Sequence, residues 1–398
     1  MTSSSLDLSP DQASALATLL TWLEKPTSPF LSLGGYAGTG KTTLVSILRQ
    51  ELLRTKPDLS VAFCAYTGRA SQVLRGYLEE REALGPADSC GTIHALLYSP
   101  EFDDGGRLLY WKRSKTVKAD LIIVDEASMV TQAIWLDLLG CNKPIIAIGD
   151  HGQLPPIEGS FNLMEKPDLT LERIHRQAEK NPIIRLAQQA RLEGKIDPGI
   201  YGKHIRKLSH STDEPGEIND LVDELLSDVR DETLVLCGRN KTRVGLNQAI
   251  RQKAGREGAE PEAGEKVVCL KNIYDRARMP IYNGMTGIIE HIVPDGEHWY
   301  DASITFPEEG RFFEGRVCRT QFHNPSLVDG IPGIPVKEVG NRFDFGYALT
   351  VHKAQGSQAD TVVLFEERFI KSDENQWKRW LYTAVTRARK NLYIIGQD

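Results

Sequence analysis

FLSLGGYAGTGKTTL, residues 30–44, is the stretch of sequence that decides the fold of this chain. An apolar run of strand length leads into a glycine-rich turn, and the turn leads into an amphipathic run. The spacing from Gly35 through four residues to Gly40, Lys41 and Thr42 is the P-loop pattern, with the strand before it and the helix after it that this motif requires. A turn that is merely rich in glycine would not need that context. The sequence therefore predicts a nucleoside triphosphate site on an α/β fold.

The residue types of this loop suit triphosphate chemistry. Glycines let the backbone turn its N–H groups toward phosphate oxygens, and the helix that follows directs its positive end at the same anion. Lys41 is predicted to reach the β and γ phosphates and Thr42 to ligate Mg²⁺, so the expected cofactors are ATP and Mg²⁺. The nucleotide contacts assigned to this stretch are Gly35, Gly38, Thr39, Gly40, Lys41, Thr42 and Thr43.

Length and composition limit what the rest of the chain can be. The 398 residues allow two or three domains, and no apolar run approaches the roughly 18 residues that a membrane span needs. Because the start of the chain lacks a secretory layout, we expect a cytoplasmic protein of a bacterium or of a phage-infected cell. The six cysteines stand singly, which argues against a zinc site or a disulfide framework. A net charge of −6 confines nucleic-acid binding to a local groove.

A helix is predicted over residues 8–23, beginning near Ser9 and Pro10. Its predicted apolar face consists of Ala13, Leu16, Ala17, Leu20 and Leu23. Gln12 lies in the first turn, and its amide can offer a donor and an acceptor to the edge of adenine. Taken alone, Gln12 also fits a solvated helix residue, but the motifs further along the chain favour a nucleotide contact.

Polar residues follow two later strands in positions that suit hydrolysis. The run DLIIVDEASM, residues 120–129, is an apolar strand that ends in Asp125 and Glu126. Asp125 is predicted to hold Mg²⁺, and Glu126 to orient and deprotonate the attacking water. Gln153 follows the next buried strand, residues 143–150, where its amide can detect the γ-phosphate. The alternative to this sensor is a simple proline-rich connection.

Two further segments predict contact with a polymer. Thr67 and Arg69 lie at the carboxyl end of the strand predicted at 59–67, where functional residues of open α/β sheets gather. A hairpin with its turn at 103–106 carries Tyr110 and Trp111 among lysines and arginines, a pattern that stacks bases and follows phosphates. The alternatives are a solvated basic helix face and a hairpin with a small aromatic core of its own.

The second half of the chain predicts another parallel sheet. TLVLCG, TVVLF and NLYII are continuous apolar runs separated by segments of helix length. Between the first and second of them, residues 266–340 contain short alternating runs bounded by Gly, Pro and Asp. This change of pattern indicates a small antiparallel barrel inserted into the α/β domain.

The motifs together resemble those of superfamily 1 helicases, in detail the RecD-like and phage Dda-like branch. The resemblance rests on GYAGTGKTTL, AYTGRA, TIHALL, LIIVDEASM and AIGDHGQLPPI, followed by LERIHRQ, LCGRNKTRVGLNQAIR, CLKNIYDRARMPIYNGMTGIIE, FGYALTVHKAQGSQADTVVLF and WLYTAVTRARKNLYII. These motifs cover nearly all of the chain. The sequence departs from the pattern at Gln358, where the family usually has a glutamate, so a contact that needs a carboxylate there is in doubt.

The resemblance implies a fold of two RecA-like parallel-sheet motor domains. The first is expected over residues 1–170, with a β-hairpin insert at about 95–118. The second is expected over 171–265 and 341–398, and it carries an SH3-like β-barrel insert over 266–340.

The resemblance also implies residue roles that spacing alone does not give. Arg176 and Arg387 are expected to neutralise the γ-phosphate in the transition state, and Gly356, beside Gln355 and Ser357, to connect nucleotide with DNA. The expected DNA contacts are Thr67, Arg69, Thr92, His94, Tyr110, Trp111, Asn283, Thr350, His352 and Lys353. The expected strand-separating pin contains Phe102, Tyr110 and Trp111. His352 also fits a buried structural histidine.

The implied function is that of an ATP-dependent helicase that travels 5′ to 3′ on single-stranded DNA and unwinds duplexes in replication, recombination or repair. Polarity follows from the resemblance alone. The alternatives are a translocase that remodels protein–DNA complexes without unwinding, an inactive regulatory ATPase module, and a motor that acts on RNA. The expected partners are single-stranded DNA, its junctions with duplex DNA, and a single-strand binding protein or replisome component, with the chain acting as a monomer.

Overall fold

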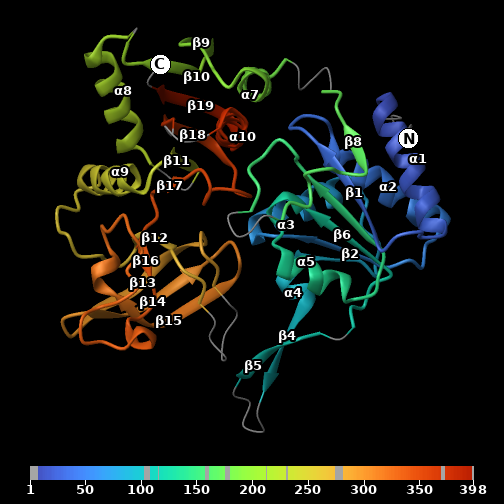
Figure 1. Ribbon diagram of the computed structural model, residues 1–398, viewed down its shortest axis with the longest axis horizontal. Coiled ribbons are helices and arrows are strands. Elements are labelled where there is room, and N and C mark those ends of the chain that lie inside the picture. The colour runs from blue at the N-terminus through green and yellow to red at the C-terminus, as the bar shows by residue number, and fades with distance from the viewer. Residues whose placement is uncertain are drawn as a thin grey trace. The chain divides into compact units, whose positions relative to one another are not determined.

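The computed structural model describes residues 8–102, 108–114, 116–156, 161–174, 180–211, 213–229, 232–273, 281–368 and 373–396. The chain divides into two compact units, the first made of residues 1–99 and 112–191, the second of residues 100–111 and 192–398. Both units are built around a parallel sheet covered by helices, as the α/β prediction requires (Figure 1).

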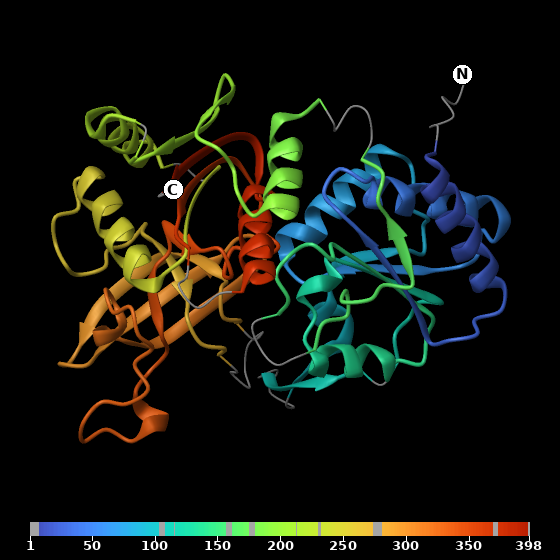
Figure 2. The same cartoon turned by 45° about the horizontal axis from the view of Figure 1, so that its top comes forward.

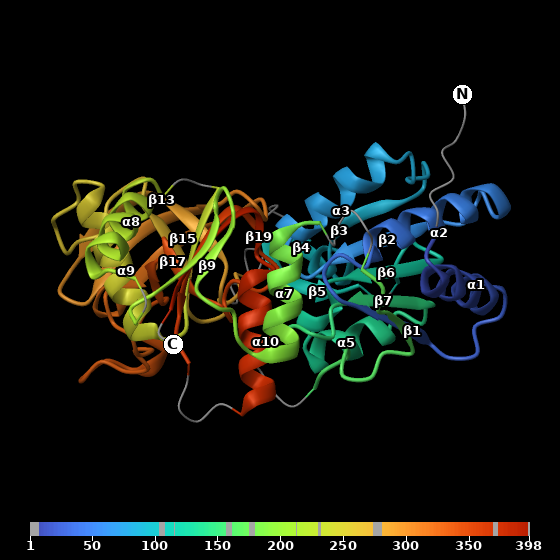
Figure 3. The ribbon, with the colours of Figure 1, turned by 90° about the horizontal axis from the view of Figure 1, so that it is seen from above.

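The sheet of the first unit contains six strands in the order β3-β2-β6-β7-β1-β8. Every pairing recorded in it is parallel. The strands are β1 (Phe30–Gly35), β2 (Val61–Ala65), β3 (Ser89–Thr92), β6 (Leu121–Asp125), β7 (Ile145–Gly149) and β8 (Leu169–Leu171). The central strands are buried on both faces, which is why their sequences are continuously apolar rather than alternating. Figure 3 shows β2, β6, β7 and β1 side by side.

Helices cover both faces of this sheet. One face packs against α1 (Pro10–Glu24), α2 (Lys41–Thr55) and α3 (Gly68–Glu80), through side chains that include Trp22, Leu48 and Leu78. The other face packs against α4 (Ile93–Leu97) and α5 (Gln132–Leu139), through Leu97 and Trp135. The hairpin arms β4 (Tyr98–Phe102) and β5 (Leu108–Arg113) form a separate two-stranded sheet. The predicted turn at 103–106 lies outside the described residues.

The predicted apolar face of the first helix was correct only in part: Leu16, Leu20 and Leu23 are half-buried and pack against the core. The buried residues of α1 are Gln12, Ala15, Leu19 and Trp22, whereas Ala13 and Ala17 are exposed. The prediction grouped apolar residues and left out Gln12, but the helix turns this glutamine inward with its bulkiest apolar residues. The start of the helix was correct: Ser9 is the N-cap and forms a capping box with Gln12.

The division between the units lies later in the chain than the predicted boundary at residue 170. Strand β8 pairs with β1 and so completes the first sheet, and most of α7 (Pro182–Glu193) is assigned to the first unit. The sequence placed the boundary before LERIHRQ, because that motif resembles the entry to a second motor domain. Pairing between β1 and β8 is a long-range contact that the pattern of residues does not reveal.

The second parallel sheet has the strand order β17-β11-β18-β19-β10-β9. Its strands are β9 (Gly199–Gly202), β10 (Ile205–Ser209), β11 (Thr233–Cys237), β17 (Ala348–Thr350), β18 (Ala359–Glu366) and β19 (Ala388–Gly396). Only the edge strand β9 runs antiparallel to its neighbour. The helices α8 (Pro215–Ser227) and α9 (Asn240–Lys253) share a core with β11 and β18, and α10 (Glu374–Val385) packs on β18 and β19.

An antiparallel sheet of five strands is inserted into the second unit, between α9 and β17, and is called here the accessory sheet (Figure 2). Its order is β15-β14-β13-β12-β16, with β12 (Lys266–Cys269), β13 (Thr286–Asp295), β14 (Trp299–Phe306), β15 (Arg311–Cys318) and β16 (Phe343–Phe345). The last of these strands lies beyond residue 340, so the inserted sheet extends past its predicted end. Its core is aromatic, with Phe306, Phe343 and Phe345 fully buried.

Among the described residues, no helix is long and apolar enough to cross a membrane. Five of the six cysteines are buried and Cys90 is half-buried. Burial raises the pKa of the Cys90 thiol to about 11 and that of Cys237 to about 12, so these groups stay protonated and unreactive near neutral pH.

Candidate functional site

The predicted motifs of the first unit gather at one edge of its sheet. The P-loop follows β1, Asp125 ends β6, and the turn with Gln153 follows β7, and these three strands are neighbours in the sheet. Thr67 follows β2 and Thr92 ends β3, the two strands on the far side of β6. Because parallel strands present their carboxyl ends at the same edge, the fold places nucleotide residues at one part of this edge and predicted DNA residues at the other.

Two glycines of the predicted P-loop have a left-handed backbone. Gly38 and Gly40 have φ angles of +82° and +77°, a left-handed conformation that glycine adopts without strain. A Cβ at Gly35 would lie 2.6 Å from Oγ1 of Thr39, so the turn leaves no room for a side chain there. The ammonium of Lys41 donates to the carbonyls of Gly35 (2.8 Å) and Tyr36 (3.1 Å). The lysine is thus held inside the loop, and its donors can pass from these carbonyls to a phosphate.

Gln12 contacts the P-loop directly. Its Nε2 donates to the carbonyl of Thr39 (3.1 Å), its Oε1 accepts from the N–H of Ser9 (3.1 Å), and the residue is only 1% exposed. The helix α1 is therefore bonded to the turn that is predicted to wrap the phosphates. Reading of the adenine edge by Gln12 stays a prediction.

Replacing Gln12 with alanine is expected to raise the KM for ATP, because the loop loses the bond that fixes the carbonyl of Thr39. The increase has an upper limit of about 150-fold, reached only if the whole cost of about 1–3 kcal/mol for the unpaired carbonyl opposes ATP binding. The kcat is expected to change less, since Gln12 does not touch the reacting atoms. Steady-state ATPase assays measure both. Gln50→Ala is the matched control, because Gln50 makes the same kind of amide bond, to the carbonyl of Arg81, at an exposed place on α2. An unchanged KM in Gln12→Ala would show that this bond does not shape the loop.

Asp125 is the last residue of β6, and Glu126, which follows it, has an unusual backbone conformation. Glu126 has a φ of +51°, and its N–H donates to Oδ1 of Asp125 (2.9 Å). Burial, and next the neighbouring charge of Glu126, raise the pKa of Asp125 to about 6, while the charge of Lys41 acts in the opposite direction. A desolvated carboxylate beside a second carboxylate favours a bound cation, and together with the hydroxyl of Thr42 it offers the oxygen donors that Mg²⁺ prefers. The residues present therefore fit an Mg²⁺ ion held by Asp125 and Thr42.

Gln153 is anchored by an aspartate that the sequence analysis did not single out. Asp150 is buried at the end of β7, where its carboxylate accepts from the N–H of Gly152 (2.9 Å) and from Nε2 of Gln153 (3.4 Å). These bonds fix the turn that carries the predicted γ-phosphate sensor. The signal was present in the sequence, since an aspartate at a strand end commonly accepts from the N–H groups of the following turn.

Two further P-loop threonines have partners within the first unit. Oγ1 of Thr43 lies 2.6 Å from the hydroxyl of Tyr77 on α3, and Oγ1 of Thr39 donates to the carbonyl of Tyr36 (2.8 Å). The ring of Tyr36 also lies 4.1 Å from that of His151, which follows β7. The P-loop therefore contacts both α3 and the turn that carries Gln153.

The predicted DNA contacts of the first unit differ in burial and in hydrogen bonding. The hydroxyls of Thr67 and Thr92 cap α3 and α4 by accepting from the N–H groups of Ala70 and Ala95. The ring of His94 is buried between Tyr66 and Tyr98, so a DNA contact through it requires the ring to leave this position. The side chains of Arg69, Phe102, Tyr110 and Trp111 lie outside the described residues, and their DNA and pin roles stay predictions.

Arg387 is buried and bonded to residues of the second unit. It is 1% exposed and donates to the carbonyls of Thr383 (2.9 Å) and Ser357 (3.2 Å) and to the hydroxyl of Thr386 (3.1 Å). These bonds join the end of α10 to the turn of Gly356, whose φ of +75° favours glycine. These three bonds hold each nitrogen of the guanidinium to a group of the second unit. Arg176 lies outside the described residues.

The remaining predicted DNA contacts come together where the accessory sheet meets the second parallel sheet. Thr350 ends β17, and Lys353 lies in the turn that follows. The N–H of Lys353 donates to the carbonyl of Thr350 (2.9 Å). A Cβ on Gly284 would lie 3.4 Å from the carbonyl oxygen of Lys353, so the turn at Asn283 and Gly284 packs directly on this lysine. Burial lowers the pKa of His352 and, together with the charge of Arg243, that of Lys353 to about 8. Gln358, the departure from the family pattern, is exposed.

Comparison with known families agrees with this geometry. Residues 7–211, a little over half of the chain, match the family model described as AAA domain. The chain belongs to the AAA domain family. Residues 345–395 of this AAA-domain protein also match the model described as UvrD-like helicase C-terminal domain. This second match covers the turn with Gly356 and the helix that ends before Arg387.

Whole-chain relatives confirm the resemblance to the RecD-like branch. The protein is 30% identical over 390 residues to the ATP-dependent RecD2 DNA helicase of Deinococcus radiodurans, covering 92% of this chain and 46% of that protein. It is 27% identical over 418 residues to the RecBCD enzyme subunit RecD of Mycolicibacterium smegmatis. This match covers 92% of this chain and 68% of that protein. The chain thus spans less than half the length of the first relative and about two thirds of the second. A Bacteroides Pif1 helicase, crystallised with ADP-AlF3 and single-stranded DNA, shares 18% identity and a TM-score of 0.48 over 98% of this chain and 92% of that one.

Proposed function

We propose that this protein is an ATP-dependent DNA helicase that moves 5′ to 3′ along single-stranded DNA. The observation that carries the proposal is the common sheet edge, where the P-loop with Lys41, the Asp125–Glu126 pair and Gln153 follow three neighbouring strands. The relatives named as DNA helicase and as RecBCD subunit support the activity and the substrate. The direction of travel is supported by the RecD-like resemblance.

In the proposed reaction, backbone N–H groups of the P-loop and the ammonium of Lys41 bind the β and γ phosphates. The carboxylate of Glu126 orients the attacking water and takes its proton, while Gln153, fixed by Asp150, contacts the γ-phosphate. Mg²⁺ held by Asp125 and Thr42 would neutralise charge on the phosphates. Arg387 and Arg176 are assigned to the charge that builds up on the γ-phosphate oxygens in the transition state.

The proposed DNA contacts are the residues at the other part of the sheet edge, Thr67 and Thr92, and the cluster of Asn283, Thr350, His352 and Lys353 in the second unit. Phosphate contacts of this kind hold single strands with little dependence on sequence. Since Arg387 bonds the turn of Gly356, which follows Lys353 by three residues, a change at the nucleotide can reach the DNA contacts through one short segment. The proposal therefore includes a direct connection between hydrolysis and grip on DNA.

The test uses two partial duplexes, one with a 5′ single-stranded tail and one with a 3′ tail. ATP-dependent strand separation of the 5′-tailed substrate alone is expected, with ATPase that single-stranded DNA stimulates. Lys41→Ala is expected to abolish both activities, because it removes the side-chain charge that binds the phosphates. Separation from the 3′ tail would overturn the polarity, and DNA-stimulated ATPase without any strand separation would favour a translocase.

A further inference from the structure

A stripe of polar side chains is buried on one face of α9. Arg243, Asn247 and Arg251 stand four residues apart, so they share one face of the helix, and all three are at most 2% exposed. We call them the polar stripe. Burying two guanidinium groups and an amide costs free energy unless each group has hydrogen-bond or ion-pair partners. The partners of the polar stripe therefore indicate which segments it stabilises.

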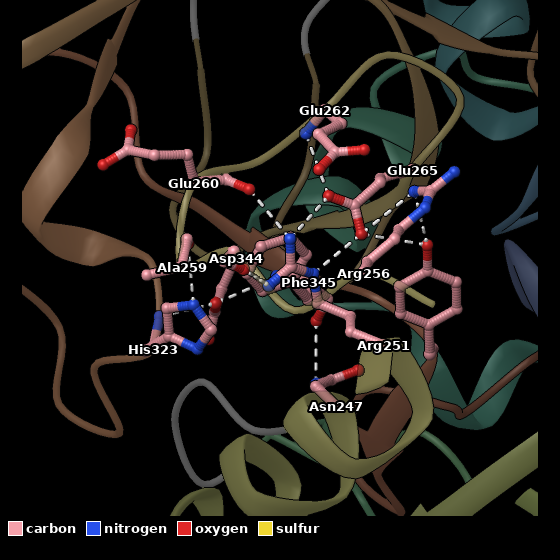
Figure 4. Close-up of polar contacts among 12 residues, drawn as sticks. Asn247, Arg251, Arg256, Ala259, Glu260, Glu262, Glu265, His323, Asp344 and Phe345 are labelled. Carbon is pink, nitrogen blue, oxygen red and sulfur yellow. Dashed lines mark hydrogen bonds and ion pairs between the residues drawn. The ribbon is translucent and has the colours of Figure 1, made fainter. Parts of the chain in front are cut away.

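Each member of the stripe binds a segment that joins the accessory sheet to the second parallel sheet. Nε of Arg251 lies 2.8 Å from Oε1 of Glu265, the residue before β12 (Figure 4). Asn247 donates to the carbonyls of Phe345 (2.9 Å) and Ala348 (3.3 Å) and accepts from the N–H of Ala348 (2.8 Å). The chain enters the accessory sheet at residue 265 and leaves it at 345–348. The polar stripe therefore holds both connecting segments of the accessory sheet against α9.

The third member, Arg243, binds Asp344 on the last strand of the accessory sheet. Their charged atoms lie 2.8 Å apart, and both side chains are buried. The same carboxylate accepts from the N–H groups of His323 (3.0 Å) and Phe345 (2.9 Å). Asp344 is thus held by one backbone N–H of β16, one backbone N–H of the segment that follows β15, and one cation of α9.

Strand β12 links the ion pair to the predicted DNA contact Lys353. Val268 of β12 pairs with Asp344, and the carbonyl of the next residue, Cys269, accepts from the N–H of Gly284 (2.8 Å), which packs on Lys353. Arg243 lowers the pKa of this lysine, whereas Asp344 and Cys269 act to raise it. These groups come from α9, β16 and β12, and the turn at Asn283 and Gly284, which packs on the lysine, adds no titratable side chain. Asp344 therefore interacts with two cations, Arg243 and Lys353, and it forms its ion pair with Arg243.

We propose that Arg243 and Asp344 are positioning residues for the DNA-contacting turn: their ion pair fixes the accessory sheet to α9 and keeps Asp344 from taking Lys353 as its partner. The ammonium of Lys353 then remains available to a DNA phosphate, next to Asn283 from the accessory sheet. This inference rests on the proposed function, because it assigns a ligand to Lys353. An apolar pair could hold α9 and the accessory sheet together equally well, but it would not govern the charge of the lysine.

The inference predicts opposite effects for the two single variants. Asp344→Asn keeps an acceptor for the N–H groups of His323 and Phe345 but leaves Arg243 without its counter-charge, so the pKa of Lys353 falls further. Arg243→Met leaves Asp344 to pair with Lys353, so that pKa rises and the ammonium is held away from DNA. The double variant removes both charges and is expected to return the pKa toward that of the wild type.

The experiment measures fluorescence anisotropy of a labelled oligothymidine between about pH 6.5 and 9.5 at constant ionic strength. Wild-type affinity is expected to fall up to about tenfold from pH 7 to pH 9, because a contact that needs the charged form of a group with a pKa near 8 is lost over that range. The midpoint of this loss is expected to move down by about one pH unit in Asp344→Asn and up by about one unit in Arg243→Met. Lys353→Arg, which stays charged throughout, is expected to remove the transition.

Thermal unfolding of every variant separates this role from a structural one. If the ion pair only stabilises the fold, both single variants lower Tm while the midpoint stays at its wild-type pH, and the inference is overturned. A wild-type midpoint that persists in Lys353→Arg overturns it as well. Failure of the wild type to bind the oligothymidine at any pH would instead overturn the proposed function. Should a single variant not fold, the double variant compared with Lys353→Arg still tests the origin of the transition.

Discussion

Replacing Glu126 with glutamine is expected to slow ATP hydrolysis by about 10²- to 10⁴-fold, the usual contribution of a positioned general base. Glutamine has nearly the same size and keeps a carbonyl oxygen for the water, but it cannot take up the proton. The N–H of residue 126 would still donate to Asp125, so the proposed Mg²⁺ ligand and the P-loop are expected to be unaffected. Binding of a fluorescent ATP analogue should therefore stay within a few-fold of the wild type. Single-turnover hydrolysis and equilibrium binding measure the two effects separately.

The chain offers a close control for this variant. Glu82 is the same residue type with nearly the same left-handed backbone, φ +52° against +51°, but it follows α3 at an exposed position. Glu82→Gln is expected to hydrolyse ATP like the wild type. If Glu126→Gln also did so, Glu126 would not be the base, and the left-handed backbone at the end of β6 would need another explanation.

The second large effect is expected in Asp88→Ala, which should lower the free energy of unfolding by about 3–5 kcal/mol, the usual result of removing one partner of a buried ion pair. Asp88 receives two bonds from the guanidinium of Arg49, at 2.8 and 2.9 Å, and both side chains are 1% exposed. The same carboxylate accepts from the N–H groups of Val61 (2.8 Å) and Gly85 (2.7 Å). The variant would leave a buried charge and two backbone donors without their acceptor.

Urea unfolding of the whole chain, followed by tryptophan fluorescence, measures this loss of stability. Arg54→Ala removes an exposed ion pair with Glu51 on the same helix, α2, and is expected to cost under about 1 kcal/mol. Similar losses for the two variants would show that the Arg49–Asp88 pair contributes no more than an exposed one. Because α2 carries Lys41 and Thr42 at its other end, ATP binding by Asp88→Ala should be compared at a denaturant concentration where the variant is still folded.

The sequence by itself determined the features that depend on neighbouring residues. The strand, glycine turn and lysine of residues 30–44 form a P-loop because each step is a local conformational preference. The strand ends that carry Asp125 and Gln153 were also predictable, since continuous apolar runs indicate strands buried on both faces. Parallel strands then bring those ends to one edge without any further information.

The tertiary structure alone decided which polar residues are buried and which partners they meet. Gln12 bonds Thr39 across 27 residues, Arg49 bonds Asp88 across 39, and Arg243 of α9 reaches Asp344 on the accessory sheet. Periodicity counts apolar residues, so it could not show that Gln12 is buried on α1 and could not recognise the polar stripe of α9. The cost of burying such groups is repaid only by a specific partner distant in the chain, and that partner exists only after the sheets have formed.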